Sequence, residues 1–424
     1  MMKNKKIFIG ILGLGYVGLP LAIEFGKKFK VIGYDYNSLR ISQLKNKIDT
    51  NNDIIKKEFF NAKFLKFTNN YNSLLNCNTY IITVPTPIDK KKNPNLKFIR
   101  EACNTVGSLI SLNDTIIFES TVYPGLTEEF CVPIIEKKSK LIFNKDFFCG
   151  YSPERINPND KIHNITNIIK VTSGSNKKTA FFIDKLYKSI VKAGTYRAPS
   201  IKIAEAAKVI ENTQRDLNIA FVNELTLIFD KLKIDTDEVL KAASTKWNFI
   251  NFKPGLVGGH CIGVDPYYLT YISKSAGYNP KIITAGREVN DKFVNYVISK
   301  SEREISKIFK KKKHKYLILG LTFKENCSDF RNSKSIEIVE KLKKRKHLVH
   351  CFDPLIQKKY FIKKHNLKLI TKFQANFYDC IIISVAHKEF SKFRKNKLNK
   401  YLKSNGKIFD IKRVLPFSEN NIYL

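Results

Sequence analysis

The pattern of hydrophobic and polar residues divides the chain into two regions of short buried strands, one on each side of a helical region. In the first region, runs of nearly continuous apolar residues alternate with segments that suit helices. Such runs are typical of parallel strands that are buried on both faces of a sheet. The predicted strands are Lys6–Leu12, Lys30–Tyr34, Asn78–Val84, Asp114–Glu119 and a strand near Phe147–Gly150. A helix from about Leu19 to Lys28 joins the first two strands.

The middle of the chain has the period of helices. Apolar residues recur near helical spacing at Ile203, Ala207, Ile210 and Leu217. This spacing predicts one long helix from Ser200 to about Leu232. Further helices are predicted over Asp235–Ala243 and Tyr267–Ile308.

Strands and helices alternate again beyond the basic segment Phe309–Lys315, which we interpret as a solvated linker. The predicted strands are Tyr316–Gly320, His347–Phe352, Asp379–Val385 and Lys407–Ile411. The predicted fold class is therefore α/β, with two Rossmann-like α/β domains joined by an all-helical central domain. We place the three domains at residues 1–199, 200–308 and 309–424.

A glycine-rich turn follows the first strand. Its GxGxxG pattern lies between a strand and a helix, where glycines let a dinucleotide pyrophosphate approach the helix N-terminus. The candidate cofactor-binding residues of the turn are Gly13, Gly15, Tyr16, Val17 and Gly18. Asp35 ends the second strand, where a carboxylate accepts from ribose hydroxyls and favours NAD over NADP. Arg40 either clamps phosphate or adenine, or is a charge on a helix surface.

Polar residues follow three further strands of the first region. Thr86, Thr121 and Glu154 each come shortly after the carboxyl end of a strand, the edge at which open α/β sheets bind their ligands. Each residue taken singly suits a turn or a cap. Together, and with Arg155, they form a candidate site wall, in which Thr86 and Thr121 face the nicotinamide side and are candidate cofactor-binding residues.

One cysteine lies in a glycine-rich loop that runs from Phe252 to Tyr268. Gly255, Gly258 and Gly259 precede Cys261, and Asp265 follows it. A thiol on such a loop is placed for nucleophilic attack, although a surface loop with a structural cysteine has the same pattern.

Lys208 and Asn212 project from one face of the long predicted helix, four residues apart. They are either an exposed pair, or a cation and an amide presented together to a reacting oxygen.

The charge of the chain bears on its partners. The 424 residues carry a formal net charge of +37, which is typical of proteins that bind nucleic acid, anionic membranes or anionic substrates. A composition rich in Lys, Asn and Ile, as in proteins of AT-rich genomes, explains the charge equally well. Since no nucleic-acid-binding motif accompanies it, we expect no specific nucleic-acid partner.

The cysteines and the N-terminal segment bear on the compartment. Eight cysteines occur singly, without a CxxC pair, which favours a reducing cytoplasm. The apolar segment Ile7–Phe25 contains four glycines, Pro20 and Glu24, and fits a buried strand and helix better than a signal peptide or a membrane span. We expect no membrane insertion and no metal site.

The chain resembles the UDP-glucose/GDP-mannose dehydrogenase family over nearly its whole length. The motifs that carry the resemblance occur in one order: Gly13–Pro20, Val84–Pro87, Ser120–Thr121, Ser152–Glu154, Lys208 with Asn212, Gly258–Cys261 with Asp265, and Phe323–Lys324 with Arg331. The resemblance implies an NAD-binding first domain, a central domain with the catalytic loop that mediates dimerisation, and a C-terminal domain that binds the UDP-sugar.

The resemblance also implies a four-electron oxidation of the sugar C6 for surface polysaccharide synthesis. Cys261 would form a thiohemiacetal and then a thioester, while Lys208 and Asn212 stabilise the oxyanions. Thr121, Glu154 and Asp265 are the candidates for proton transfer. Arg331 resembles the family's cofactor-facing arginine. The implied substrate-binding residues are Glu154, Arg155, Lys208, Asn212, Phe252, Lys253, Gly258 and Lys324.

Departures from the family pattern concern the substrate. The stretch Gly258–Leu269 looks like the branch that acts on UDP-N-acetylhexosamines, and Ile262–Val264 replaces the usual lysine before Asp265. Pro158 stands where UDP-glucose relatives carry a second glutamate. The resemblance favours UDP-N-acetylglucosamine, with UDP-N-acetylgalactosamine or UDP-N-acetylmannosamine as alternatives. A non-catalytic, dinucleotide-sensing scaffold that binds nucleic acid is the alternative from another class.

Overall fold

The structure is a computed structural model that describes residues 6–51, 54–156, 162–259, 262–357, 361–362, 365, 367–393 and 395–424, with the backbone alone at residues 395 and 396. It divides into two compact units. The first contains the chain up to Glu211 together with Tyr267–Asn279, and the second contains Asn212–Pro266 and Pro280–Leu424. The boundaries of the three predicted domains stay a prediction.

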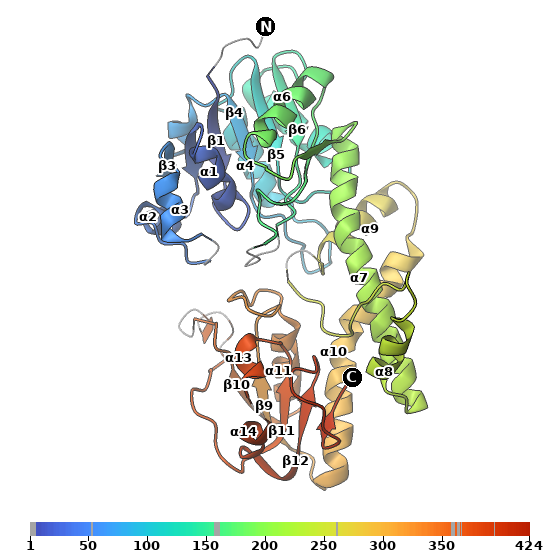
Figure 1. The fold of residues 1–424 in the computed structure, drawn as a ribbon. Helices are drawn as coiled ribbons and strands as arrows, with labels where there is room; N and C mark the ends of the chain where they lie inside the picture. The colour runs from blue at the N-terminus through green and yellow to red at the C-terminus, as the bar shows by residue number, and fades with distance from the viewer. Residues whose placement is uncertain are drawn as a thin grey trace. The chain divides into compact units, whose positions relative to one another are not determined.

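The first unit is built on a six-stranded sheet in which every neighbouring pair of strands is parallel (Figure 1). Across the sheet the order is β3 (Leu65–Thr68), β2 (Lys30–Tyr34), β1 (Phe8–Leu12), β4 (Thr79–Ile82), β5 (Asp114–Phe118) and β6 (Phe147–Tyr151). The order reverses direction between β1 and β4, which is the point where sheets of this type bind ligands. The predicted fold class is confirmed here.

The helices of the first unit connect and cover these strands. They are α1 (Gly18–Gly26), α2 (Ser38–Lys45), α3 (Lys56–Asn61), α4 (Lys97–Gly107), α5 (Val132–Ser139), α6 (Lys177–Lys188) and α9 (Asp265–Ser275). Two short helices, η1 (Tyr71–Leu74) and η2 (Thr127–Cys131), and a parallel pair, β7 (Lys170–Thr172) with β8 (Thr195–Arg197), complete the unit. The core is continuous because Ile9, Ile81 and Ile117, from three strands, are fully buried against Phe25 of α1.

The second unit contains another parallel sheet. The order is β10 (Leu348–Phe352), β9 (Lys315–Leu319), β11 (Tyr378–Ile383), β12 (Leu402–Asp410) and β13 (Asn421–Ile422). Its helices are α8 (Thr236–Ala243), α10 (Lys281–Ile308), α11 (Lys334–Lys344), α13 (Lys388–Ser391) and α14 (Lys395–Asn399). Helix α10 packs along this sheet and against α11 (Figure 1), and it buries Phe293 and Val297 in the same core as Ile318 and Ile382.

Helix α7 (Ile201–Leu232) confirms the long helix predicted from the apolar spacing. The helical structure predicted over Tyr267–Ile308 is present as two helices, because α9 ends at Ser275 and α10 starts at Lys281. Gly277 adopts a positive φ of +84°, and Pro280 is the N-cap of α10 with an extended backbone. Both conformations interrupt a helix.

The basic segment Phe309–Lys315 is not a wholly solvated linker. Lys311 forms an ion pair of 2.7 Å with Asp379, and His314 is buried. Over the ranges that the structure describes, no helix combines the length and the apolar character needed to cross a membrane.

A buried ion pair ties the main sheet of the first unit to the β7–β8 pair. Glu119 directly follows β5 and Lys170 begins β7, and their charged atoms are 2.5 Å apart in a place where both residues are almost fully buried. The other Glu119 oxygen accepts a hydrogen bond from the hydroxyl of Tyr187 in α6. Burial raises the pKa of Glu119 and lowers that of Lys170, whereas the charge of each partner opposes these shifts.

We expect Lys170→Met to lower the free energy of unfolding by about 3–5 kcal/mol, since it leaves the Glu119 carboxylate buried without its cation. The double variant Lys170→Met, Glu119→Gln should recover much of this loss, because it removes both charges. Chemical denaturation of the three proteins measures the effect.

Lys202→Met is the matched control, because Lys202 and Glu129 are both exposed and form a surface pair of 3.0 Å. Exposed pairs contribute roughly 0–1 kcal/mol. Equal losses for Lys170→Met and Lys202→Met would contradict the importance of the buried pair.

Candidate functional site

The glycine-rich turn after β1 leaves room for a ligand. Gly13 has a φ of +94°, and a Cβ at Gly18 would lie 1.8 Å from the carbonyl oxygen of Gly13. At Gly15, by contrast, a Cβ would meet no atom of the described residues within 4 Å. The turn leads into α1, whose N-cap Val17 has no polar side-chain atom to cap the first N–H groups. Beside it, Tyr16 is half-buried. These features fit a bound pyrophosphate.

Two residues hold the peptide that follows Gly13. Asp35 Oδ2 accepts the N–H of Leu14 at 2.9 Å, and Arg40 Nε donates to the carbonyl oxygen of Leu14 at 3.0 Å. Arg40 also pairs with Asp49 at 2.8 Å and is buried. The interpretation of Arg40 as a charge on a helix surface is therefore wrong. Its contact with the cofactor stays a prediction.

Thr86 and Thr121 lie together, as their places after β4 and β5 predict. Thr86 Oγ1 donates to the carbonyl oxygen of Thr121 at 2.6 Å. The hydroxyl of Tyr268 donates to the carbonyl oxygen of Thr86 at 2.8 Å, which joins α9 to the same edge. Ser120 Oγ donates to the carbonyl oxygen of Val84 at 2.6 Å. The two loops therefore form one wall at the carboxyl edge of the sheet.

Lys170 also holds the segment that presents Glu154. Its ammonium donates to the carbonyl oxygens of Ser152 at 3.3 Å and Pro153 at 2.7 Å. Burial lowers the pKa of Lys170, and the partner Glu119 raises it. The charge of Glu154 makes a further contribution that also raises this pKa. The Glu154 carboxylate accepts the N–H of Ile156. The buried ion pair thus lies directly behind two candidate catalytic loops, those of Thr121 and Glu154.

Three residues at successive turns of α7 relate the helix to these loops. Glu205 accepts the N–H groups of Gly125 at 2.6 Å and Thr127 at 3.0 Å, and burial raises its pKa to about 7. Glu211 pairs with Arg155 at 2.5 Å, so the arginine next to Glu154 is fixed to the helix. Lys208 lies between Glu205 and Glu211 and is buried, with 4% of its surface exposed.

The second unit holds the other part of the predicted site. Asn212 Nδ2 donates to Asp265 Oδ2 at 2.6 Å, and Asp265 is buried. This contact joins α7 to the start of α9. Of the loop between them, Phe252 is half-buried and Lys253 is exposed. Cys261, the predicted nucleophile, lies outside the described residues, as does Pro158.

The glycines before Cys261 face the loop that follows β9. A Cβ at Gly258 would lie 2.6 Å from the carbonyl oxygen of Asn332, and a Cβ at Gly259 would lie 2.6 Å from the ring of Phe323. Gly259 also has a φ of +87°. Close packing therefore requires glycine at both positions, and it brings the loop that precedes Cys261 against the segment that carries Lys324.

Lys324 and Arg331 lie on this segment. The Lys324 ammonium is 5.8 Å from the centre of the Phe323 ring. Arg331 forms an ion pair of 2.7 Å with Asp329 and is partly exposed. The roles of Lys324 toward the substrate and of Arg331 toward the cofactor stay predictions.

Several positioning residues were not predicted from the sequence, namely Glu119, Lys170, Glu205 and Glu211. A signal was present for two of them. Glu119 ends an apolar strand, and Lys170 interrupts the apolar run from Ile168 to Val171, so each is a charge where the pattern expects a buried residue. Burial of a charge calls for a partner, but the pattern does not say which residue that partner is.

Comparisons with known proteins identify the family. Profiles of the UDP-glucose/GDP-mannose dehydrogenase family match in order: its NAD binding domain over residues 7–191, its central domain over 202–292 and its UDP binding domain over 317–416. A UDP-N-acetyl-D-glucosamine 6-dehydrogenase of Salmonella typhi is 50% identical, with 100% of each chain covered. The enzyme of that name from Pseudomonas aeruginosa is 49% identical at the same coverage.

Solved structures agree with this assignment. A UDP-D-ManNAc dehydrogenase from Pyrococcus horikoshii superposes with a TM-score of 0.88 at 28% identity, over 98% of each chain. The predicted cofactor is confirmed as NAD by the match to the NAD binding domain, and the predicted family by the three profiles. The chain thus belongs to the UDP-glucose/GDP-mannose dehydrogenase family, whose members are NAD-dependent oxidoreductases of nucleotide sugars.

Proposed function

We propose that the chain oxidises C6 of UDP-N-acetylglucosamine to the uronic acid for surface polysaccharide synthesis. The observation that carries the proposal is the full-length identity of 50% and 49% to two enzymes named for that reaction. Relatives named UDP-N-acetyl-D-mannosamine dehydrogenase are 30–34% identical. UDP-N-acetylmannosamine and UDP-N-acetylgalactosamine are therefore the second choices. A protein of 48% identity from Staphylococcus aureus is named CapL, in keeping with a role in capsule or O-antigen synthesis.

The first oxidation requires a group that takes the proton of the C6 hydroxyl. NAD⁺, when bound, accepts the hydride from C6 and leaves an aldehyde. Glu154 and Thr121 are the candidates for the proton transfer, directly or through water. Their loops are both held by the Glu119–Lys170 pair, through the two carbonyl contacts of Lys170 and the place of Glu119 two residues before Thr121.

The second oxidation uses Cys261. Its thiolate attacks the aldehyde carbon, and the aldehyde oxygen gains a proton to give a thiohemiacetal. Loss of a proton, and of a second hydride that a second NAD⁺ would accept, leaves a thioester, and water then releases the carboxylate and restores the thiol. Oxyanions develop at the attack and at the hydrolysis, and we assign their stabilisation to Lys208 and Asn212. Asp265 accepts one amide hydrogen of Asn212 and so orients the second toward the substrate.

The remaining predicted residues bind rather than react. We assign Lys324, Phe252, Lys253 and Gly258 to the UDP-sugar, with Arg155 beside Glu154. The close packing of Gly258 and Gly259 on the segment Phe323–Asn332 supports a shared substrate site for the two loops of the second unit. Arg331 and the turn Gly13–Gly18 are assigned to NAD. We retain the proposed division into cofactor, central and substrate domains at 1–199, 200–308 and 309–424.

We further propose a homodimer formed through α7. Its second half exposes large apolar side chains at Phe221, Ile228 and Leu232, with 55%, 45% and 60% of their surfaces accessible. Positions separated by seven and four residues lie on one face of a helix. A second α7 offers a matching face, since a twofold interface pairs the same surface of both chains.

We place the protein in the cytoplasm, without a specific nucleic-acid partner. The seven cysteines that the structure describes are all buried and free of disulfide bonds, as expected in a reducing compartment.

The proposal predicts that UDP-N-acetylglucosamine gives two NADH for each sugar oxidised. NADH formation with a panel of UDP-N-acetylhexosamines and UDP-glucose measures both the preference and the stoichiometry. One NADH for each sugar, with an aldehyde as the product, would contradict the thioester route. A preference for another sugar in kcat/KM would replace UDP-N-acetylglucosamine as the substrate.

Cys261→Ser should still bind NAD⁺ and the UDP-sugar but lose steady-state turnover by orders of magnitude. A hydroxyl is a weaker nucleophile than a thiolate, and an ester hydrolyses more slowly than a thioester. Single-turnover NADH formation and mass spectrometry should reveal a stall after the first hydride or a trapped sugar ester. A purely structural cysteine would instead cost about 1 kcal/mol of stability and leave kcat nearly unchanged, an outcome that excludes the nucleophile.

Phe221→Glu and Ile228→Glu should each convert the dimer to a monomer in sedimentation velocity, because a carboxylate buried at an apolar interface is unfavourable. Arg215→Glu is the control, because Arg215 is exposed on α7 but lies six residues before Phe221 and so on another face of the helix, and it should leave the dimer intact. A wild-type protein that sediments as a monomer at micromolar concentration would refute the dimer.

A further inference from the structure

The two α/β sheets share one hydrogen bond, which lies at the turn after the first strand of each sheet. In the first, the N–H of Leu14 donates to Asp35 Oδ2 at 2.9 Å, and in the second, the N–H of Leu321 donates to Asp353 Oδ2 at 2.7 Å. Each aspartate directly follows the strand next to the first strand of its sheet, namely β2 and β10. Each leucine directly follows a glycine of positive φ, +94° and +87°. Asp353 therefore corresponds to Asp35.

A second shared contact extends the correspondence to the neighbouring strand. Thr83 Oγ1, after β4, donates to the carbonyl oxygen of Gly13 at 2.6 Å, and Ser384 Oγ, after β11, donates to that of Gly320 at 2.7 Å. Three residues beyond Thr83 the first unit has Thr86, which we assign to the cofactor. Three residues beyond Ser384 the second unit has His387.

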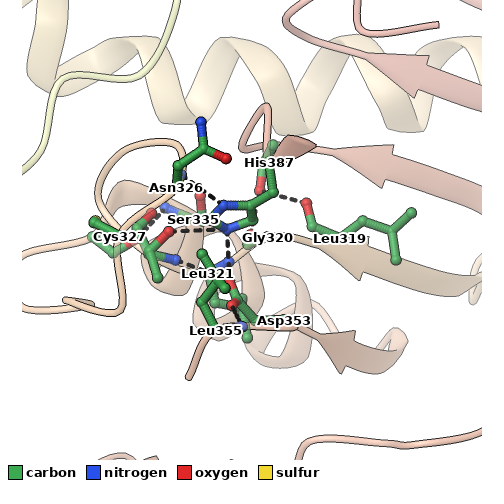
Figure 2. Close-up of polar contacts among 12 residues, drawn as sticks. Leu319, Gly320, Leu321, Asn326, Cys327, Ser335, Asp353, Leu355 and His387 are labelled. Atoms are coloured by element: carbon green, nitrogen blue, oxygen red, sulfur yellow. Dashed lines mark hydrogen bonds and ion pairs between the residues drawn. The ribbon is translucent and has the colours of Figure 1, made fainter. Parts of the chain in front are cut away.

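The corresponding aspartates, Asp35 and Asp353, differ in how deeply they are buried and in the groups that contact them. Asp35 is half-buried, whereas Asp353 is buried with 4% of its surface exposed. Asp353 Oδ2 accepts from the N–H of Thr322 at 3.3 Å besides that of Leu321, and His387 Nε2 lies 3.1 Å away (Figure 2). The other oxygen does not distinguish the two residues, since Asp353 Oδ1 accepts the N–H of Leu355 and Asp35 Oδ1 accepts the N–H of Asn37, both at 2.9 Å. The carboxylate that would bind a ribose in a dinucleotide site is thus enclosed by the protein itself.

The hydrogen bonds of His387 define its tautomer. Its Nδ1 accepts the N–H of Asn326 at 2.9 Å, so Nδ1 carries no proton. In the neutral ring the proton is then on Nε2, which is 3.1 Å from both Asp353 Oδ2 and Thr322 Oγ1. The ring is fully buried. It therefore connects the end of β10 to both ends of the segment Thr322–Asn326, as Figure 2 shows in part.

Lys324 lies within this segment, between Thr322 and Asn326, and hydrogen bonds fix the positions of both residues. Thr322 Oγ1 donates to the carbonyl oxygen of Lys324 at 2.8 Å, and the thiol of Cys327 lies 3.3 Å from the same oxygen. Asn326 has a φ of +57°, a conformation that asparagine tolerates better than most residues. Its side-chain oxygen accepts the N–H of Lys388 at 3.0 Å. The backbone of Lys324 is thus positioned from both sides.

We propose that His387 and Asp353 are positioning residues that hold Lys324 in the geometry that binds a nucleoside diphosphate. The same enclosure prevents the second α/β sheet from binding a dinucleotide, because its strand-end carboxylate is buried and in contact with His387 and Thr322. The inference rests on the proposed function in one respect, the assignment of Lys324 to the UDP group. It adds the residues that organise this contact and the class of ligand that the sheet excludes.

The test is titration of the full-length protein with UDP alone, followed by calorimetry. His387→Phe keeps a ring but removes both hydrogen-bonding nitrogens, so the Asn326 N–H and Asp353 lose a buried partner. We expect UDP binding to weaken by about tenfold or more, and KM for the UDP-sugar to rise similarly. KM for NAD⁺ should stay within about twofold, because the substitution leaves the glycine-rich turn assigned to NAD⁺ unchanged. A twofold change is smaller than the effect of losing one hydrogen bond.

Two further variants separate positioning from general damage. His350→Phe makes the same change in β10, where His350 contacts Tyr378 and stacks on Phe377, and it should leave UDP affinity unchanged. His387→Gln restores one donor and one acceptor and should recover part of the affinity. If His387→Phe does not fold, His387→Gln and Asp353→Asn carry the test, and hydrogen exchange at the Asn326 amide should be faster in both than in the wild type.

Each outcome bears on one of the two proposals. A wild type that binds UDP but oxidises no UDP-N-acetylhexosamine contradicts the proposed function and leaves the positioning role to the titration. Unchanged UDP affinity in a folded His387→Phe protein overturns the positioning role alone. Binding of two NAD⁺ for each wild-type chain would overturn the exclusion of a dinucleotide from the second sheet.

Discussion

One type of hydrogen bond fixes the turn after the first strand in both α/β sheets of this protein. The backbone N–H that follows a glycine donates to the aspartate that follows the neighbouring strand. It closes the turn at Leu14 on Asp35 and the turn at Leu321 on Asp353. Because parallel strands gather their carboxyl ends at one edge, the position of this turn determines where every following loop can lie. The same contact serves two purposes: Asp35 stays open to a cofactor, whereas Asp353 is enclosed.

Charged residues fix the positions of the candidate catalytic loops in the first unit. Glu119 and Lys170 hold the loops of Thr121 and Glu154, and Glu205 with Glu211 ties those loops to α7. A network of buried charges is costly to desolvate, but once formed it permits few alternative arrangements. Rigid support of this kind suits the proposed mechanism, in which charge develops at two successive steps.

Much of the fold and of the candidate site could be predicted from the sequence, because its signals are local. The strands around Ile9 and Ile81, the glycine turn and Asp35 each depend on residues close together in the chain. The interruption between α9 and α10 also has a local signal, since Gly277 is followed closely by Pro280. Arg40, Lys170 and His387 could not be assigned, because their partners Asp49, Glu119 and Asp353 are identified only by the folded chain.

Burial of the described cysteines has a chemical consequence for selectivity. Burial raises the pKa of both Cys77 and Cys351 to about 12, so at neutral pH each remains a thiol rather than a thiolate. A thiol reacts slowly with aldehydes, oxidants and alkylating reagents compared with its thiolate. In the proposed reaction, these two thiols would therefore not compete with Cys261 for the aldehyde.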